Sequence, residues 1–364
     1  MSHPNSHTAR LTVRLGAVAE NYRICRSLAG RAAVSGVVKA NAYGLGATEV
    51  TRTLLAERCD TFFVARLEEG IALRPITPQS RIFILDGAHI ESIPALIAHN
   101  LTPVLNSLAE IELWSRYARG RDAAVHIDTG MNRLGLPPAE LAILSAEAGQ
   151  RLSGIPLALI VGHLACADDR SAADNRLQLA RFRAALAALP PAPASFASSG
   201  GILLGPDYAF DLVRPGIGLY GGNPHTGYPN AFKTAVRLTA PILQLRRVDK
   251  GECVGYGATF RVGRPTALAT VALGYADGLM RALGNRGVGA IGGQKAPIAG
   301  RVSMDLVSLD VTDVPGDLVT SDAEVEFLGD TVLLEDVAAA AGTANYEILT
   351  SIGARVPRIH EGAQ

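Results

Sequence analysis

The sequence predicts an α/β fold, an N-terminal (β/α)8 barrel of the TIM type followed by a C-terminal, mainly antiparallel β domain. Two patterns carry this prediction. Up to residue 221, short apolar runs alternate with stretches of helical spacing, and beyond it the chain shows short strands with little helix. Strands that alternate with helices imply parallel βαβ units, and eight such units imply a closed barrel.

The barrel elements can be read in order along the first part of the chain. Residues 9–15 alternate apolar and polar side chains, which predicts a strand, and residues 17–28 have helical spacing. The runs predicted as barrel strands are 34–39, 62–65, 82–85, 103–105, 124–128, 159–163, 195–199 and 212–216. Helical stretches between them include 47–56, 93–99, 139–148 and 175–189.

A connection rich in Gly, Pro and Asn, residues 222–230, separates the two parts. Short strands are predicted beyond it at 240–248, 266–273, 290–291, 295–298, 307–311 and 323–327, and only 333–341 has a convincing helical pattern. We therefore expect a barrel domain over residues 9–230 and a β domain over 231–364. The first strand, about 9–15, is a candidate for packing on the second domain.

Composition narrows the classes of partner and compartment. The 364 residues are 48% hydrophobic and 19% charged, with a net charge of zero, which is typical of a globular protein and gives no reason to expect nucleic acid or a membrane as partner. The four cysteines lack CxxC spacing, so we expect reduced thiols and no metal site. Residues 1–14 contain no apolar signal core, and we expect a cytoplasmic protein.

Lys39 stands at the end of a run of small and β-branched residues, 33–38, that predicts a buried strand. A lysine in such a place is costly unless it is neutral or paired. Desolvation lowers the pKa of an amine, and a neutral lysine can form a Schiff base with an aldehyde. Taken alone, Lys39 is more simply explained as a lysine whose charge reaches solvent past the strand end.

Further polar groups follow the ends of other predicted strands, where TIM barrels carry their catalytic residues. They are Tyr43, the segment 128–133 with Arg133, His163, Ser198 and Ser199, and Arg214 with Gly216 and Ile217; Leu85 ends the third of these strands. Each has an ordinary explanation, such as a hydrogen-bonded core histidine, a helix cap or an ion pair. Together, the cations and hydroxyls predict a pocket for a phosphorylated cofactor and a carboxylate substrate.

Several segments of this chain resemble motifs of the alanine racemases, a family of enzymes that use pyridoxal 5′-phosphate (PLP). Residues 37–46, VVKANAYGLG, resemble the family's cofactor-lysine motif. Further similar segments are 126–135 (HIDTGMNRLG), 214–221 (RPGIGLYG), 254–260 (VGYGATF), 274–278 (GYADG) and 300–305 (GRVSMD). The resemblance covers essentially the whole chain and implies the barrel, the β domain and a PLP cofactor.

The resemblance also implies a role for each matching residue. Lys39 would bind PLP as a Schiff base and act as one acid/base on the substrate α-carbon, and Tyr256 of the partner subunit would act on the opposite face. The remaining cofactor contacts would come from Tyr43, Ser199, Gly216 and Ile217 at the phosphate, from Arg214 at the pyridine nitrogen, from His163 between Arg214 and Tyr256, and from Leu85. Arg133 and Met304 would contact the substrate carboxylate, and Tyr275 would line the entrance.

The implied reaction is the interconversion of L-alanine and D-alanine by two-base proton transfer on the PLP external aldimine, in a homodimer with shared active sites. Racemisation needs a proton removed from one face and returned to the other, which requires two flanking groups. Alternatives are a serine racemase or one of broader specificity, a non-catalytic PLP-binding protein, and a PLP decarboxylase of basic amino acids. The decarboxylases place a carboxylate at the pyridine nitrogen, where this chain offers Arg214.

Two positions depart from the family pattern. His126 stands where the family often has a carbamylated lysine that pairs with the arginine of the same motif, so the orientation of Arg133 is left open. Ala354 stands directly before Arg355, where we expect a phosphate-contacting tyrosine in some members. The phosphate contacts of this chain are therefore expected to differ in part.

Overall fold

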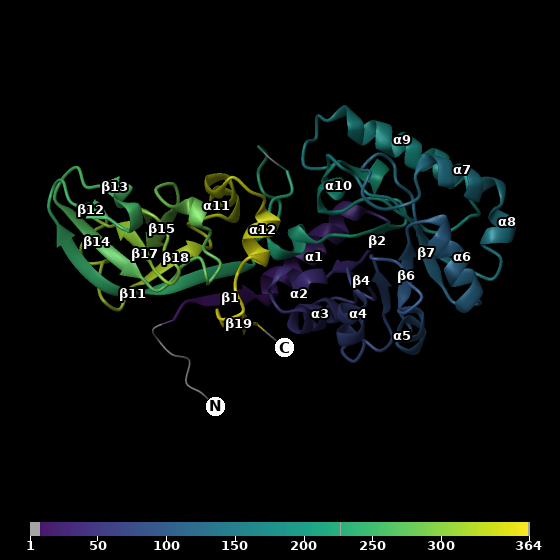
Figure 1. Cartoon of the computed structure of the whole chain (residues 1–364), viewed down its shortest axis with the longest axis horizontal. Helices are drawn as coiled ribbons and strands as arrows, with labels where there is room; N and C mark the ends of the chain where they lie inside the picture. Colours follow the sequence, from purple (N-terminus) through teal and green to yellow (C-terminus); the bar gives the residue numbers. More distant parts are fainter. Residues whose placement is uncertain (1–7, 226, 363–364) are drawn as a thin grey trace. The chain divides into compact units, whose positions relative to one another are not determined.

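The computed structural model describes residues 8–225 and 227–362, and the expectation about a targeting segment rests partly on residues 1–7, outside these ranges. Contacts divide the chain into two compact units. One unit, the barrel unit, holds residues 18–42 and 46–233. The other, the β unit, holds the described residues up to Ala17, Tyr43–Leu45 and the chain from Thr234 onward. The colours of Figure 1 follow the chain through both.

The barrel unit is built on a parallel sheet whose seven strands, β3 to β9, pair in sequence order. Its strands are β3 (Gly36–Val37), β4 (Thr61–Val64), β5 (Arg81–Ile84), β6 (Thr102–Leu105), β7 (Ala123–His126), β8 (Leu157–Val161) and β9 (Ala194–Ser195). Two further short strands, β2 (Ala33–Val34) and β10 (Leu212–Val213), pair with each other in parallel.

These two short strands close the barrel. Only Ser35 separates β2 from β3, so the two are one interrupted strand, and the Ser35 amide donates to the Val213 carbonyl at 3.0 Å. On the other side, a parallel bridge joins Ser198, just beyond β9, to Arg214, just beyond β10. The ring therefore has eight strands, which confirms the predicted barrel.

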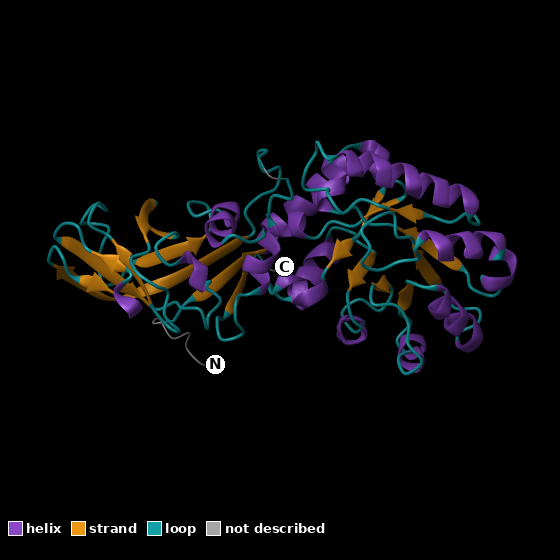
Figure 2. Ribbon diagram, turned by 45° about the horizontal axis from the view of Figure 1, so that its top comes forward, coloured by secondary structure: helices purple, strands orange, loops and turns teal. Residues whose placement is uncertain are grey.

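Helices surround the strands of this unit, as Figure 2 shows. They are α1 (Leu15–Ala29), α3 (Ala47–Ala56), α4 (Leu67–Leu73), α5 (Ile93–Ala98), α6 (Leu108–Tyr117), α7 (Pro138–Ala146), α8 (Ala148–Arg151), α9 (Ala173–Ala188) and α10 (Ser199–Leu203), with the 3-10 turns η1 (Pro206–Tyr208) and η2 (Ile217–Tyr220). The segment labelled α2 (Lys39–Tyr43) is a left-handed turn and no ordinary helix. The predicted helix 47–56 coincides with α3. Helix α6 begins at Ser107, whose side chain accepts the Glu110 amide.

Several predicted barrel strands are shorter at their carboxyl ends than expected. The predictions 34–39, 159–163, 195–199 and 212–216 end in the structure at Val37, Val161, Ser195 and Val213. The chain leaves the strand ladder there because its groups turn to other partners: the Gly162 carbonyl, for example, accepts a hydrogen bond from the Arg214 side chain at 2.7 Å. The residues lost from the strands form the mouth of the barrel.

Stacked aromatic side chains contribute to the packing of the barrel unit. Phe63 and Phe83 stack with ring centroids 4.7 Å apart, and Phe182 stacks on Phe196 at 4.6 Å. All four are buried, and burying a side chain of this size stabilises the fold by about 1.5–3 kcal/mol. The strands that carry the candidate site are thus packed against buried aromatic side chains.

The β unit contains a mainly antiparallel sheet with the order β16-β15-β18-β11-β1-β19, to which β14 and β17 are joined through β11. Its strands are β1 (Arg10–Arg14), β11 (Val236–Val248), β14 (Thr266–Val271), β15 (Val288–Ile291), β16 (Gln294–Pro297), β17 (Val307–Asp310), β18 (Glu324–Leu328) and β19 (Arg358–Glu361). Strand β1 pairs antiparallel with β11 and parallel with β19. The first strand of the chain therefore lies in this sheet.

Smaller elements complete the β unit. A hairpin of β12 (Cys253–Val254) and β13 (Phe260–Arg261) carries the 3-10 turn η3 (Tyr256–Ala258), and η4 (Arg281–Leu283) follows β14. Helix α11 (Leu334–Ala341) agrees with the predicted 333–341, whereas α12 (Asn345–Thr350) was not predicted. Within residues 8–225 and 227–362, none of the helices has both the length and the apolar character that crossing a membrane requires.

Candidate active site

Lys39 lies where β3 ends, and the chain then makes an unusual turn. Ala40, Asn41, Ala42 and Tyr43 all have φ between 52° and 57°, in the left-handed region. Such a conformation costs L-residues about 1–2 kcal/mol each. Four consecutive residues held in it, none of them glycine, indicate that the surroundings enforce the turn.

Two polar side chains hold this turn within the barrel unit. The Glu69 carboxylate accepts the Ala40 amide at 2.5 Å and the Ala65 amide at 2.8 Å, so it ties the turn to the segment between β4 and α4. The Asn41 side chain accepts the Ala47 amide at 2.8 Å, at the start of α3. The two residues after Lys39 are thus each tied to another part of the barrel unit.

The surroundings of Lys39 favour its neutral form. Burial is the main cause that lowers its pKa, and the charge of Arg133 adds to this, with a smaller contribution from Arg214. Glu69 and Asp86 act in the opposite direction without cancelling the shift. Because a neutral amine is the nucleophilic form, Lys39 is suited to attack an aldehyde.

Arg214 is fixed at the end of β10 and is only 6% exposed. Its guanidinium donates to the Ser195 hydroxyl at 2.6 Å and to the Gly162 carbonyl at 2.7 Å, and it lies 3.4 Å from Nδ1 of His163. Burial lowers the pKa of Arg214 to about 10, so the group stays cationic at neutral pH. It therefore presents a fixed positive charge inside the mouth.

His163, just beyond β8, is neutral in this environment. Burial first, and then the charges of Arg214 and Arg133, hold its pKa well below the usual value. A guanidinium can only donate, so the nitrogen facing Arg214, Nδ1, is the acceptor and the ring proton belongs on Nε2. With Nδ1 facing Arg214, the His163 ring can donate a hydrogen bond from Nε2 to a further group.

Ser199, Gly216 and Ile217 come together at the ends of β9 and β10. The Ser199 hydroxyl oxygen accepts the amides of Gly216 at 3.0 Å and Gly218 at 3.1 Å. Two amide N–H groups already donate to the Ser199 oxygen, so the hydroxyl hydrogen of Ser199 is left to donate to a further acceptor. Ser199 and Ile217 are both buried. A polarised hydroxyl in a glycine-rich backbone corner suits a phosphate group.

The loop after β7 carries Arg133. The Asp128 carboxylate accepts the amides of Gly130 and Met131, each at 2.9 Å, and of Asn132 at 3.0 Å, which folds the loop into a tight turn. Arg133 follows with an exposed side chain, and its charge contributes to the lowered pKa of Lys39. Sequence reasoning placed Arg133 at the mouth, and the structure brings it within electrostatic reach of Lys39.

Leu85 directly follows β5 and is half-buried. Its amide donates to the Val64 carbonyl at 3.0 Å, and its carbonyl accepts from the Asn106 side chain at 3.2 Å. The barrel residues predicted from sequence, Lys39, Leu85, Arg133, His163, Ser199, Arg214, Gly216 and Ile217, therefore all lie at the carboxyl ends of the strands.

Tyr43 groups with the β unit, together with Gly44 and Leu45. Its side chain is buried, which raises its pKa, and its ring centroid lies 6.0 Å from that of Tyr346 in α12. Sequence reasoning missed Tyr346, because the short helix that carries it was not predicted.

The other predicted residues of the β unit are exposed: Tyr256 by 71%, Met304 by 54% and Tyr275 by 43%. Tyr256 begins η3, in the loop of the β12–β13 hairpin. Backbone hydrogen bonds join Tyr275 to Ser303 at 3.0 Å and Ala276 to Met304 at 2.9 Å. A Cβ at Gly274 would lie 2.2 Å from the Met304 carbonyl oxygen, so this close approach requires glycine. Tyr275 and Met304 are thus brought together.

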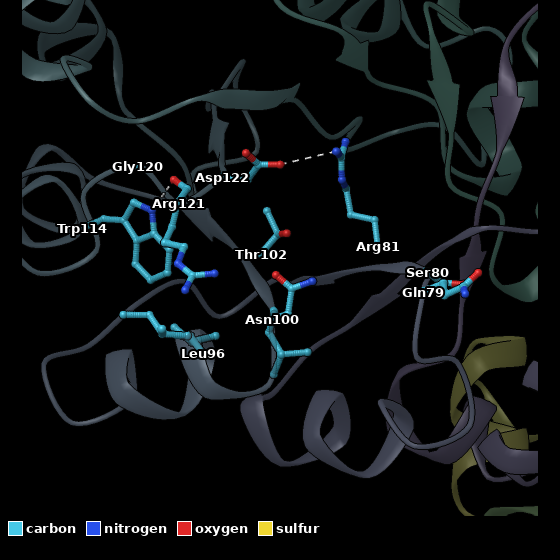
Figure 3. Close-up of a pocket in the computed structure, with 12 residues that line it drawn as sticks. Gln79, Ser80, Arg81, Leu96, Asn100, Thr102, Trp114, Gly120, Arg121 and Asp122 are labelled. Carbon is cyan, nitrogen blue, oxygen red and sulfur yellow. Dashed lines mark hydrogen bonds and ion pairs between the residues drawn. The ribbon is translucent and has the colours of Figure 1, made fainter.

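A cavity of about 330 Å³ opens at the other end of the barrel strands (Figure 3). Arg81 and Thr102, the first residues of β5 and β6, line it together with Trp114, Arg121 and Asp122. None of its lining residues is a predicted site residue, and Arg81 is paired with Asp122 at 3.4 Å. Among the described residues, no group of three His, Cys, Asp or Glu side chains is arranged to hold a metal ion.

Comparison with known proteins identifies the family. The family model "Alanine racemase, N-terminal domain" matches residues 13–224, and "Alanine racemase, C-terminal domain" matches residues 235–360. A catabolic alanine racemase of Agrobacterium fabrum is 48% identical, covering 96% of this chain and 92% of the relative. An alanine racemase of Rhodospirillum rubrum is 45% identical over 100% of this chain and 99% of its own length.

Solved structures agree. The alanine racemase of Bartonella henselae, crystallised with covalently bound pyridoxal phosphate, superposes with a TM-score of 0.93 at 40% identity and covers 98% of this chain and 100% of its own. The biosynthetic alanine racemase of Pseudomonas aeruginosa gives a TM-score of 0.92 at 35% identity, covering 98% and 99%. The chain belongs to the alanine racemase family.

Proposed function

We propose that this chain is a PLP-dependent alanine racemase, which interconverts L-alanine and D-alanine. The observation that carries the proposal is Lys39: an amine of lowered pKa, fixed at a strand end, faces the charge of Arg133 and the immobilised charge of Arg214. Family membership over the whole length supports the same activity.

The residues present fit PLP. Lys39 supplies the amine that attaches the cofactor, and Arg214 supplies a permanent cation for the pyridine nitrogen. The Ser199 hydroxyl, the backbone of Gly216 and Ile217, and Tyr43 would hold the phosphate, with Leu85 lining the cofactor. Within the β unit, the ring of Tyr346 is a neighbour of the Tyr43 ring. When bound, PLP withdraws electrons from the α-carbon of an attached amino acid.

Two side chains of this chain would move the α-proton. Lys39 would exchange it on one face through Nζ, and Tyr256 of a partner subunit would exchange it on the other through its phenolic oxygen. His163, neutral and held by Arg214, would orient that phenol by donating from Nε2. Arg133 and Met304 would hold the substrate carboxylate, and Tyr275 would line the entrance.

The exposure of Tyr256 supports a homodimer with shared sites. A general acid/base that is 71% exposed in one chain is suited to complete the site of a second copy. In this arrangement the barrel domain, residues 9–230 apart from strand β1, binds PLP, and the β domain, residues 231–364, contributes Tyr256. We place the dimer in the cytoplasm, in keeping with four free cysteines.

Alanine is the proposed substrate. The alternatives are a racemase specific for serine and a racemase that accepts a broader range of amino acids. Two alanine racemases of Agrobacterium fabrum are similar to this chain, one described as catabolic at 48% identity and one as biosynthetic at 41%. Similarity therefore supports the racemisation of alanine but does not distinguish a catabolic role from a biosynthetic one.

Chiral chromatography of alanine after incubation of the PLP-loaded protein tests the proposal. D-alanine should appear from L-alanine and the reverse, and Lys39→Ala should abolish both. A panel with L-serine and L-lysine separates the rivals: faster racemisation of serine would contradict alanine specificity, and release of CO2 from lysine would indicate a decarboxylase. A protein that binds PLP but converts none of these amino acids would be the non-catalytic carrier.

A further inference from the structure

Asn106, which is buried, and His126, which is partly buried, form a pair at the ends of β6 and β7. The Asn106 side-chain NH2 donates to the Val104 carbonyl at 2.8 Å and to the Leu85 carbonyl at 3.2 Å. These two bonds engage both hydrogens of the amide and leave its oxygen facing Nδ1 of His126 at 2.8 Å. The orientation of the Asn106 amide is therefore determined by two backbone groups.

This arrangement fixes the tautomer of His126. An amide oxygen can only accept, so Nδ1 of His126 must carry the ring proton. Burial, followed by the charge of Arg214 and more weakly that of Arg133, lowers the pKa of His126 to about 4, although Asp128 raises it. The ring is thus neutral near pH 7, and its Nε2 carries a lone pair.

Two cations, Arg214 and Arg133, influence the charge state of His126, and they differ in the partners they already have. Arg214 donates to Ser195 and Gly162. Arg133 is different: across residues 8–225 and 227–362, its guanidinium makes no hydrogen bond or ion pair with another residue.

The backbone also couples Arg133 to His126. The loop that carries Arg133 returns to the strand it left, where the Leu136 amide donates to the His126 carbonyl at 2.8 Å. Gly135 packs on the imidazole, since a Cβ there would lie 3.0 Å from the ring Cγ. The ring and the loop are therefore in close contact, and a change in one displaces the other.

We propose that His126 is a positioning residue for Arg133: when Arg133 binds the substrate carboxylate, Nε2 of His126 accepts a hydrogen bond from the guanidinium, a bond that the described residues do not themselves show, and holds it in that orientation. The inference rests on the proposed function. A neutral acceptor suits this task, because it orients the guanidinium without neutralising the charge that the substrate carboxylate needs. Asn106 acts indirectly: its side-chain oxygen accepts the hydrogen bond from the protonated Nδ1 of His126, which keeps Nε2 unprotonated.

A double-mutant cycle tests the coupling. His126→Leu keeps the bulk of the side chain and removes the acceptor, so kcat/KM for L-alanine should fall roughly 10- to 100-fold, the loss expected for a hydrogen bond to a charged group, and most of it should appear in KM. In an Arg133→Leu background the same change should have less than about a twofold effect, because the partner is already absent. His126→Gln retains an acceptor and should restore part of the loss.

A matched control is His99→Leu, at the end of α5 near the amino ends of the strands, which should change kcat/KM by less than about twofold in either background. Independent losses from His126→Leu and Arg133→Leu that add in free energy would overturn the inference. A wild-type protein without racemase activity would instead defeat the proposed function.

Nitrogen NMR of the PLP-loaded dimer labelled with [15N]histidine gives a readout apart from activity. The His126 resonances, identified by their loss in His126→Gln, should show a protonated Nδ1 and an unprotonated Nε2 at neutral pH. Asn106→Asp should raise the pKa of His126, because a carboxylate favours the charged ring. Nε2 would then become a donor, and KM should rise. A protonated Nε2 in the wild type would overturn the inference.

Discussion

The carboxylate of Glu69 accepts the backbone N–H of Ala40 at 2.5 Å, directly after the lysine proposed to bind PLP. The same carboxylate accepts the amides of Ala65 and Arg66, so one acidic side chain at the start of α4 caps its own helix and restrains the left-handed turn. Lys39 is thereby positioned by a residue thirty positions further along the chain.

Glu69→Ala should therefore weaken cofactor binding without removing the cofactor lysine. The turn loses the acceptor for Ala40 and α4 loses its cap, which together should cost about 2 kcal/mol of unfolding free energy. We expect the Kd for PLP to rise roughly 10-fold, because the relaxed turn must be re-formed on binding. Spectroscopic PLP titration and urea unfolding measure the two effects.

The control for this prediction is Glu68→Ala on the same helix, since Glu68 is exposed and should leave PLP affinity within about twofold of wild type. Equal PLP affinity in the Glu69 and Glu68 variants would contradict a role for Glu69 in restraining the turn.

Arg214 should control the partition between racemisation and transamination. A glutamate in its place favours a protonated pyridine nitrogen, because an opposite charge stabilises the charged form. Arg214→Glu should therefore produce more pyruvate per racemisation event, as measured by coupled assay. Arg214→Lys keeps the charge and should retain the wild-type partition. An unchanged ratio in a folded Arg214→Glu protein would remove Arg214 from that role.

The pH dependence of cofactor attachment should report the environment of Lys39. Its pKa is lowered by burial and by Arg133, so the amine is already neutral at a pH where an exposed lysine is charged. Arg133→Leu removes one lowering charge, and the pH at which the apoenzyme binds PLP covalently should shift upward. The shift is measured by borohydride trapping across a pH series. A downward shift would contradict the assignment.

A mixing experiment tests whether the two proton-transfer residues meet across subunits. Lys39→Ala and Tyr256→Phe homodimers should each be nearly inactive. After unfolding and refolding as an equal mixture, half the dimers should be mixed, and each mixed dimer has one intact site, so about a quarter of wild-type activity should return. Each variant refolded alone is the control. No recovery after verified exchange would place Lys39 and Tyr256 in one chain's site.

The barrel could be predicted because its determinants are local. Apolar runs at regular intervals, with helical stretches between them, require only the sequence on either side of each strand, and the polar residues that end those strands identify the mouth. The closing pair β2–β10 fits the same pattern, although its strands contain only two residues each. Strand ends were less predictable, because Ser199 and Gly162 contact side chains and loops from other strands.

The missed features depend on contacts between distant segments. The left-handed turn at Ala40 contains no glycine to indicate it, and it is held by Glu69, whose spacing from Arg66 signals only a helix start. Tyr346 lies in a six-residue helix beside Tyr43, about three hundred positions away in the sequence. The resemblance drew attention to His126, but its tautomer follows from Asn106, a residue on a neighbouring strand.

The segment that follows Lys39 is completed by the last part of the chain. Arg358 donates to the Gly44 carbonyl at 3.0 Å, and the His360 ring lies 2.8 Å from the Leu45 carbonyl. The two partners in each contact are separated by 314 and 315 residues. A ribosome that adds roughly 5–20 residues per second therefore synthesises Arg358 and His360 about 15–60 s after Gly44 and Leu45. Gly44 and Leu45 are thus synthesised well before the residues that hold them exist. We therefore expect the segment 43–45 to reach its final arrangement only when almost the whole chain has been synthesised.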